Sequence, residues 1–178
     1  MAQAPGAPGV ASVSVEGTKT TYSAAIVGLV PAASCTDFYT IKGSASKTVR
    51  VTRLEVSGNA TGAAAADLQL IVRSTADTGG TSTTPTAVPH DSASAAATAV
   101  VNAYTANPTT GTTVGTVRAQ KLTLPAAPGA PVPIIWDFSI RNEQALVLRG
   151  VAQQLCLNLN AGTYAGNSFD VSLAWTEE

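Results

Sequence analysis

The sequence has few charged residues and no excess of either sign. Asp, Glu, Lys and Arg make up 12% of the 178 residues, and the formal net charge is −1. That share of charge is about half of what an average globular protein carries. Proteins that bind the phosphate backbone of nucleic acids need a basic patch, and this chain has neither such a patch nor an acidic tail. The composition therefore argues against nucleic acid as a partner.

Reactive side chains are also scarce, with one His, two Cys and one Met. This inventory does not supply the four Cys or His ligands of a structural zinc site, and no glycine-rich phosphate-binding motif occurs. The acids are scattered, without the spacing of a calcium loop. We therefore expect no metal and no cofactor. Cys35 and Cys156 are too few for a disulfide framework, so we favour two buried thiols, while a single bridge between strands stays open.

Long apolar runs are missing as well. The longest apolar stretch, 24–33, is interrupted by Gly28 and Pro31, which excludes a membrane-spanning helix. The first residues, MAQAPGAPGV, lack the charged start and apolar core of a signal peptide. We therefore expect a protein that is made and assembled in a cytoplasm, without a membrane partner.

Helical periodicity is nearly absent, and alternation of apolar and polar residues takes its place. The alanine clusters 63–66 and 93–97 allow at most one helical turn each. Alternation with a period of two predicts strands with one buried face. The expected strands are 11–16, 22–30, 38–42, 48–56, 68–72, 100–104, 117–124, 134–138, 145–149, 155–159 and 169–175. About ten short strands separated by Gly, Asn, Pro and Ser indicate an all-β fold, an antiparallel β-sandwich or jelly roll.

Several details of the sandwich follow from the same pattern. The apolar phase changes between Val51 and Leu54, which predicts a β-bulge near Thr52–Arg53. The last two strands, joined by residues 161–167, are expected to form a hairpin, and segment 22–30 to be a central strand. The core is expected to contain Leu68, Leu70, Leu155, Leu157, Leu159, Phe169, Val171 and Leu173.

Three segments fall outside the strands. Residues 1–9 form an extended arm rich in Ala, Pro and Gly, and residues 10–178 are expected to form a single domain. Residues 75–97 form a long loop, and residues 125–133 form a proline-rich connection. Long loops in compact domains often contact partners, so we expect these two segments to lie at subunit contacts. We expect the arm to be ordered against a neighbouring subunit or a shell, with strand pairing beginning beyond Pro8.

The candidates for catalysis are weak. His90 is followed by Asp91 and Ser92, but adjacent residues in a proline-flanked loop rarely converge as a triad requires. The carboxylates available for glycoside cleavage are Glu16, Glu55, Asp67, Asp137, Glu143 and Asp170, and no pairing among them is evident. We therefore expect no enzyme and assign no catalytic residue.

The remaining polar and aromatic residues have structural interpretations. We expect Arg50, Arg53, Arg73, Arg141 and Arg149 to form ion pairs with Glu55, Asp67 or Glu143. Trp136 and Trp175 are candidates for a sugar-stacking platform, but the phase of Trp175 favours the core. The string Asn59–Ala60–Thr61 matches a glycosylation pattern by chance.

Residues 21–58, 73–109 and 146–178 resemble segments of small virion proteins of tailed phages, the head decoration or cement proteins and other minor structural proteins with a jelly-roll fold. This resemblance implies a virion structural protein at the capsid surface, a homotrimer whose partner is the major capsid protein of a phage head. The alternative is a tail-fibre, baseplate or head-fibre module that recognises host surface glycans. Such a module needs an exposed pocket, for which Trp136, Tyr104 and Tyr164 are the available walls.

Overall fold

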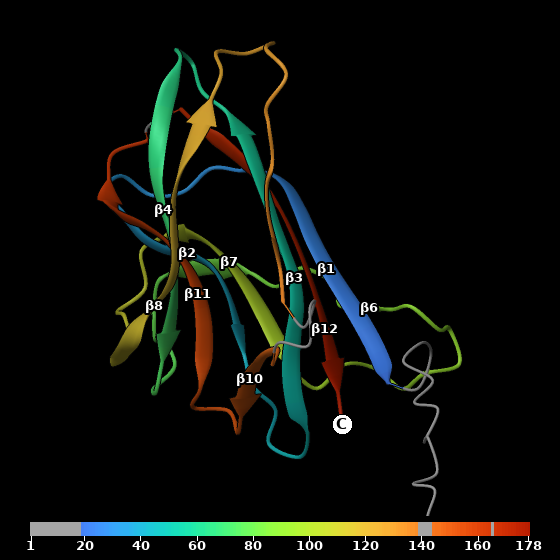
Figure 1. Ribbon diagram of the computed structural model, residues 1–178. Coiled ribbons are helices and arrows are strands. Elements are labelled where there is room, and N and C mark those ends of the chain that lie inside the picture. The colour runs from blue at the N-terminus through green and yellow to red at the C-terminus, as the bar shows by residue number, and fades with distance from the viewer. Residues whose placement is uncertain (1–18, 139–143, 165) are drawn as a thin grey trace, which may run out of the picture.

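A computed structural model describes residues 19–138, 144–164 and 166–178, and these ranges contain strands but no helix. The described part of the chain therefore has no helix long and apolar enough to cross a membrane. Two six-stranded antiparallel sheets pack face to face (Figure 1). The expected all-β sandwich is confirmed. The strands are β1 (Thr20–Leu29), β2 (Cys35–Lys42), β3 (Thr48–Asn59), β4 (Ala64–Arg73), β5 (Thr81–Thr83), β6 (Val88–Pro89), β7 (Val100–Ala106), β8 (Thr113–Leu124), β9 (Ile134–Asp137), β10 (Leu146–Arg149), β11 (Gln154–Gly162) and β12 (Ser168–Glu177).

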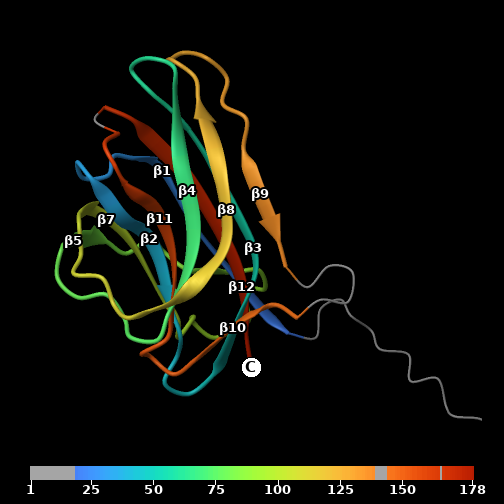
Figure 2. The ribbon, with the colours of Figure 1, turned by 60° about the vertical axis from the view of Figure 1, so that its left-hand side comes forward.

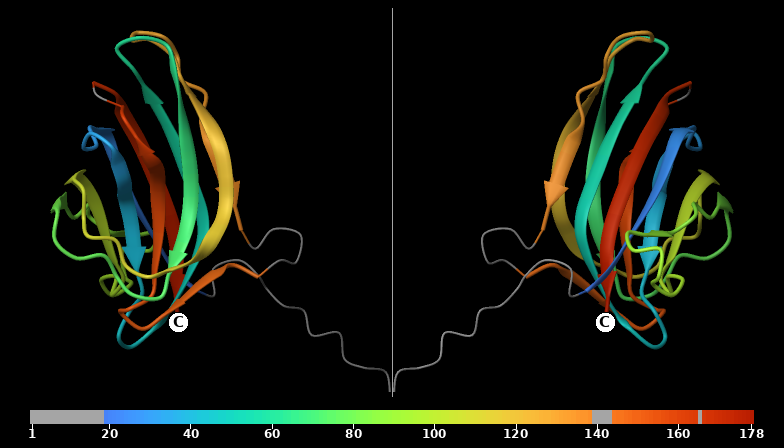
Figure 3. Two further views of the ribbon diagram at one scale, coloured as in Figure 1. Left: turned by 90° about the vertical axis from the view of Figure 1, so that its left-hand side faces the viewer. Right: turned by 90° about the vertical axis from the view of Figure 1, so that its right-hand side faces the viewer.

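The strands pair in a nested order. Sheet A runs β10–β3–β12–β1–β6, with β9 also paired to β3, and sheet B runs β5–β7–β2–β11–β4–β8. The first long strand pairs with the last, β1 with β12, and the second with the next to last, β2 with β11. Within these pairs, β3 pairs with β9 and β10, and β4 pairs with β8. The chain thus folds back on itself across two layers (Figure 2), and Figure 3 shows sheet B toward the viewer on its left and sheet A toward the viewer on its right.

The expected hairpin of the last two strands is wrong. Strands β11 and β12 lie in opposite sheets, β11 between β2 and β4 and β12 between β1 and β3. In the sequence both strands alternate apolar and polar residues, and that pattern is the same for strands that pair side by side and for strands that face each other across a core. Strand β1 is also not central, because only the two-residue β6 pairs beyond it.

The β-bulge near Thr52 is confirmed. On β12, Ala174 pairs with Arg53 and the next residue, Trp175, pairs with Val51, so Thr52 is the extra residue. The hydroxyl of Thr52 donates to the carbonyl of Ala174 at 3.1 Å. The bulge lets the apolar residues before and after it, from Val49 to Val56, all point into the core, where each is at most 2% exposed.

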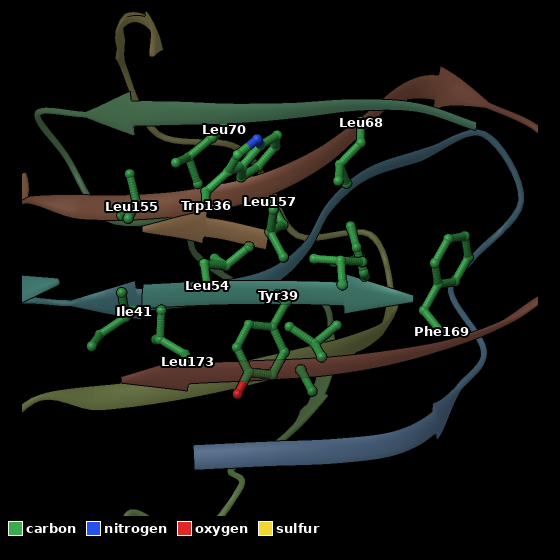
Figure 4. Close-up of a cluster of buried hydrophobic side chains, with 14 of the residues drawn as sticks. Tyr39, Ile41, Leu54, Leu68, Leu70, Trp136, Leu155, Leu157, Phe169 and Leu173 are labelled. Carbon is green, nitrogen blue, oxygen red and sulfur yellow. The ribbon is translucent and has the colours of Figure 1, made fainter. Parts of the chain in front are cut away.

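The core fills the space between the two sheets (Figure 4). All eight residues expected in it are buried, with at most 2% of each exposed. Trp175 and Trp136 are also buried, the first stacked on Tyr22 with ring centroids 5.8 Å apart. The interpretation of Trp175 as a core residue is therefore confirmed, and Trp136 belongs to the same core.

The segments expected to lie outside the strands are partly regular in the structure. Loop 75–97 contains the short strands β5 and β6, so it is partly ordered on the sheet edges. The alanines at 64–66 begin β4, and residues 93–97 form no helix. The arm 1–9 and the expected strand 11–16 lie outside the described residues.

Candidate functional site

The outer face of sheet B carries a buried cluster of polar residues. Asp37 and Thr40 come from β2, Arg73 from the end of β4, and Cys156 and Asn158 from β11. All five are at most 7% exposed, although their side chains point away from the main core. Segments 74–80 and 107–113 cover them, held together by the pairing of Thr78 with Thr109. A buried polar cluster of this kind is stable only when its members satisfy one another.

Arg73 and Asp37 form the centre of this polar cluster. The Nε of Arg73 donates to one oxygen of Asp37 at 2.6 Å, and Nη2 donates to the other at 3.0 Å. The amide of Asn158 donates to Asp37 at 2.6 Å, and the remaining Arg73 nitrogen donates to Thr113 and to the carbonyl of Gly111. Burial alone would lower the pKa of Arg73, but this bidentate ion pair with Asp37 raises it above its usual value. The pair ties β2 to β4 across β11.

Asp77 attaches the covering segments to the sheet. Its carboxylate accepts from the N–H of Gly111 at 2.8 Å, and its own N–H donates to the side chain of Gln154 at 2.6 Å. Burial and the neighbouring Asp37 carboxylate raise the pKa of Asp77 to about 6, and the Gly111 hydrogen bond and the Arg73 charge oppose them only in part. A buried carboxyl with this pKa carries a proton in mildly acidic solution.

The same cluster contains the only grouping of acidic and thiol ligands in the described ranges. One ligand atom each of Asp37, Asp77 and Cys156 lies within 4.8 Å of the others, and the hydroxyl of Thr40 beside them has no hydrogen-bond partner. Arg73 sits among these atoms, 3.5 Å from Asp77, and supplies the positive charge that a metal ion would otherwise bring. The arrangement is that of a structural ion network.

Both cysteines are buried and free, as we expected for two thiols without a bridge. Burial, and then the charge of Asp37, raise the pKa of Cys35 to about 12. Burial also raises the pKa of Cys156 well above its usual value, with Asp37 and Asp77 adding to the effect. Neither thiol has the lowered pKa of a nucleophile.

The single histidine lies on the other sheet, beside a shallow groove. The Nε2 of His90 is 2.6 Å from the hydroxyl of Ser23, and the N–H of His90 donates to the carbonyl of Thr21. The groove has a volume of about 300 Å³ and runs over the outer face of β1, β12 and β3, with Ser172 and Ala174 on its floor. Neither Asp91 nor Ser92 joins this contact; the carboxylate of Asp91 accepts from Ala93. The contact fastens β6 to β1.

The carboxylates expected as candidates for glycoside cleavage are dispersed. Glu55 and Asp137 come near each other only through Arg53, which donates to both. Asp67 pairs with Lys121 on the surface of sheet B, and Asp170 accepts from the N–H of Gly28. Glu16 and Glu143 lie outside the described residues.

The ion-pair partners of the arginines agree only in part with those expected from the sequence. Arg53 pairs with Glu55 as expected, but Arg73 pairs with Asp37 and Arg50 pairs with Glu178. Arg149 bonds the hydroxyl of Thr48. Arg141 lies outside the described residues. The partner of an arginine depends on which strands become neighbours, and the alternation pattern does not contain that information.

The aromatic residues considered for a sugar platform are not exposed together, because Trp136 lies in the core and Tyr104 lies beside the polar cluster of sheet B. Trp136 is 8% exposed and Tyr104 is 5% exposed. Tyr164 is half-buried, accepts from the N–H of Asp67 and packs edge-on against Phe169. No stacking surface is therefore formed by these three.

Comparison with protein-family models, curated proteins and solved structures finds no match to this chain. The function must therefore be argued from the geometry and from the resemblance of the sequence.

Sequence reasoning missed the two acids that organise the buried cluster. Asp37 interrupts an otherwise uncharged run in β2, Cys35–Ile41, and a lone charge within a buried strand is a signal of pairing. Asp77 carries no such signal, because it lies in a polar loop whose path over sheet B is visible only in three dimensions.

Proposed function

We propose that this chain is a virion structural protein that binds the outside of a tailed-phage head and stabilises the shell as an oligomer. The observation that carries the proposal is the nested strand pairing, from which we infer a jelly roll. Jelly rolls occur in viral capsid and lectin domains. Because a fold does not by itself define a function, the surface must supply the rest of the argument.

The outer face of sheet A has the properties of a large docking surface. One row across it contains Arg53, Ala174 and Ser23, and the next row contains Glu55, Ser172 and Ala25. The small side chains form the shallow groove on this face, and its central charge, Arg53, is already neutralised by two carboxylates. A partner that covers such a face removes little unpaired charge from water, so the desolvation cost is small.

Oligomerisation strengthens this attachment. The resemblance of the sequence implies a homotrimer on the major capsid protein, and a symmetric oligomer multiplies weak contacts into avidity. We assign the contacts between subunits to loop 75–97 and the connection 125–133. Loop 75–97 is anchored just beyond its C-terminal end, where the carboxylate of Glu177 accepts hydrogen bonds from Thr98 and Ala99. The exposed middle of the loop is therefore held in place by the sheet.

The test is the location of the chain in intact particles, determined by electron microscopy, combined with binding of the purified protein to isolated heads. We expect density on the head surface and binding that weakens at least tenfold when Ser172→Arg introduces a charge on the outer face of sheet A. The matched control is Thr123→Arg, an exposed threonine on β8 of sheet B, which leaves binding unchanged. Absence from the head surface, or equal binding of both variants and the wild type, contradicts the proposal.

A glycan-binding module is the second candidate, and one feature favours it. A hollow of about 350 Å³ lies over β4 and β8 of sheet B, and the polar residues in its lining are Asp67, Gln69, Gln120, Lys121 and Asn160. Amides and charged groups of this kind hydrogen-bond to sugar hydroxyls, but no aromatic side chain lines this hollow. Binding on a glycan array that is lost in Gln69→Ala and kept in Ser172→Arg would favour this candidate over capsid decoration.

A further inference from the structure

Strand β1 has an uncovered edge without charge or proline, although its register with β12 shifts between Ile26 and Leu29. Only Tyr22 and Ser23 are paired on that side, by β6, and Ala24–Val27 have no strand beyond them among the described residues. The sequence of β1, TTYSAAIVGL, contains no charged residue and no proline. Val27 is 83% exposed, and Ile26 is only partly buried against the core. An uncharged apolar edge is a template for another strand. Figure 1 shows β1 at the border of sheet A.

The other edges in the described chain are protected. Strands β5, β9 and β10 have only three or four residues each. Strand β8 is long, but it carries Arg118 and Lys121, and its pairing with β4 is broken twice by register shifts. The Arg118 guanidinium lies over the ring of Phe138, 5.7 Å from its centroid. Charges and bulges of this kind prevent edge-to-edge pairing. The edge of β1 is thus the site where an extra strand fits.

We propose that residues 11–16 of a second copy of this chain add a strand to sheet A along Ala24–Val27. This inference rests on the oligomer of the proposed function and specifies one contact within it. In the segment ASVSVE, Val13 and Val15 lie on one phase and the serines on the other. With the valines facing inward, they cover Ile26 and extend the core, and the serines face water. Neither partner strand brings a charge to the contact except Glu16 at its end.

We assign the occupant to a second copy because the chain's own segment 11–16 cannot reach this edge with all six of its residues in the pairing. Strand β6 occupies the place where a direct hairpin would continue from β1. For the segment to pair beyond β6 in the same chain, Val15 would have to lie beside Ala24. The four residues from Val15 to Lys19 span at most about 14 Å, which is less than the distance from Lys19 to that position. The five residues of chain from Lys19 to Ala24 measure about 16 Å, and the neighbouring strand lies about 4.8 Å to the side. When each copy donates its segment to the next, the contact is head-to-tail, and three copies close a ring when the rotation between neighbours is about 120°.

Cysteine cross-linking tests this contact with the full chain. One copy carries Ser12→Cys or Ser14→Cys, the two outward positions, and a second copy of different tag length carries Ala25→Cys. We expect oxidation to link the two copies. The matched control partner is Val114→Cys on the edge of β8, where the side chain is 67% exposed, and it forms no link. A link to Val114→Cys, a link within one chain when Ser14→Cys and Ala25→Cys are combined, or no link at either serine overturns the proposal.

A second measurement separates this inference from the proposed function. Val27→Lys places a charge on the β1 edge at an exposed position, and Val114→Lys does the same on β8. In native mass spectrometry, we expect Val27→Lys to lower the trimer fraction at least tenfold and Val114→Lys to leave it unchanged. Trimers that persist in Val27→Lys overturn the strand exchange but leave the assembly in place. A wild-type chain that stays monomeric both in solution and on heads contradicts the assembly itself.

Discussion

Replacing Asp77 by asparagine should stabilise the protein at neutral and alkaline pH. The folded state raises the pKa of Asp77 from 3.8 to about 6, mainly through burial. Because the folded protein binds this proton more tightly than the unfolded chain does, Asp77 makes the free energy of unfolding fall as the pH rises from about 4 to about 6. Above that window, the folded state holds an ionised carboxylate beside Asp37 at a cost. Asparagine has the same shape, still accepts from Gly111 and cannot ionise.

The size of the effect follows from the pKa. Each pKa unit corresponds to about 1.4 kcal/mol, so the full conversion gives about 3 kcal/mol, and screening by water reduces it to about 1–2 kcal/mol. We therefore expect Asp77→Asn to unfold with a free energy about 1–2 kcal/mol larger than the wild type at pH 8. The gap should shrink below pH 6 and vanish near pH 4.

Urea unfolding at a series of pH values, followed by the fluorescence of the buried Trp175 and Trp136, measures this difference. Comparison with the wild type at each pH removes the contribution of other acids, such as Glu177, whose pKa its hydrogen bonds lower despite its burial. Asp67→Asn is the control, because Asp67 makes an exposed pair with Lys121 and should change stability by less than about 0.5 kcal/mol. A variant that is less stable than the wild type at pH 8 would refute the reasoning, since it would mean that ionised Asp77 gains more from Arg73 than its burial costs.

Three further predictions concern the core, the bulge and the thiols. Leu157→Ala should lower the free energy of unfolding by about 2–5 kcal/mol because the side chain is fully packed, and a loss below about 0.5 kcal/mol would place that face at a surface. Deleting Thr52 should lower the free energy of unfolding by at least about 3 kcal/mol, because it turns the buried Val49 and Val51 outward. Thr52→Ala keeps the bulge and should lower the free energy of unfolding by less than about 1 kcal/mol. Equal losses in the two variants would show that Thr52 does not act as the extra residue of the bulge. Cys35 and Cys156 should react with a thiol reagent at pH 8 only as fast as the protein unfolds, and modification within seconds would contradict the raised pKa of both.

The sequence predicted the strands and the core because alternation reports directly on burial. The bulge at Thr52 was predictable for the same reason, since two apolar phases in one strand need an extra residue between them. Neighbours were not predictable. The pattern of β11 and β12 suits a hairpin as well as two strands that face each other, and the choice depends on pairing with β2 and β1 far away in the sequence.

The polar cluster shows the same limit. Arg73 was expected in an ion pair, but its partner depends on β2 and β4 lying on either side of β11. Cys156 was expected only as a buried thiol because of its residue type, and its place beside Asp77 follows from the path of a loop. Residue types therefore predicted which side chains would form ion pairs. The partner of each side chain depended on the arrangement of the strands, which the sequence pattern does not report.

The nested pairing of strands determines when the protein can fold as it is made. Sheet A needs β12 between β1 and β3, and among the described strands β12 is synthesised last, ending at Glu177. Until then β1 and β3 lack the strand that joins them, and the apolar faces of both stay open to water. Contacts between residues so distant in sequence also form slowly, because a long loop must close first. Sheet A therefore cannot be completed before β12 has been synthesised, and the apolar faces of β1 and β3 are prone to aggregation in the interval.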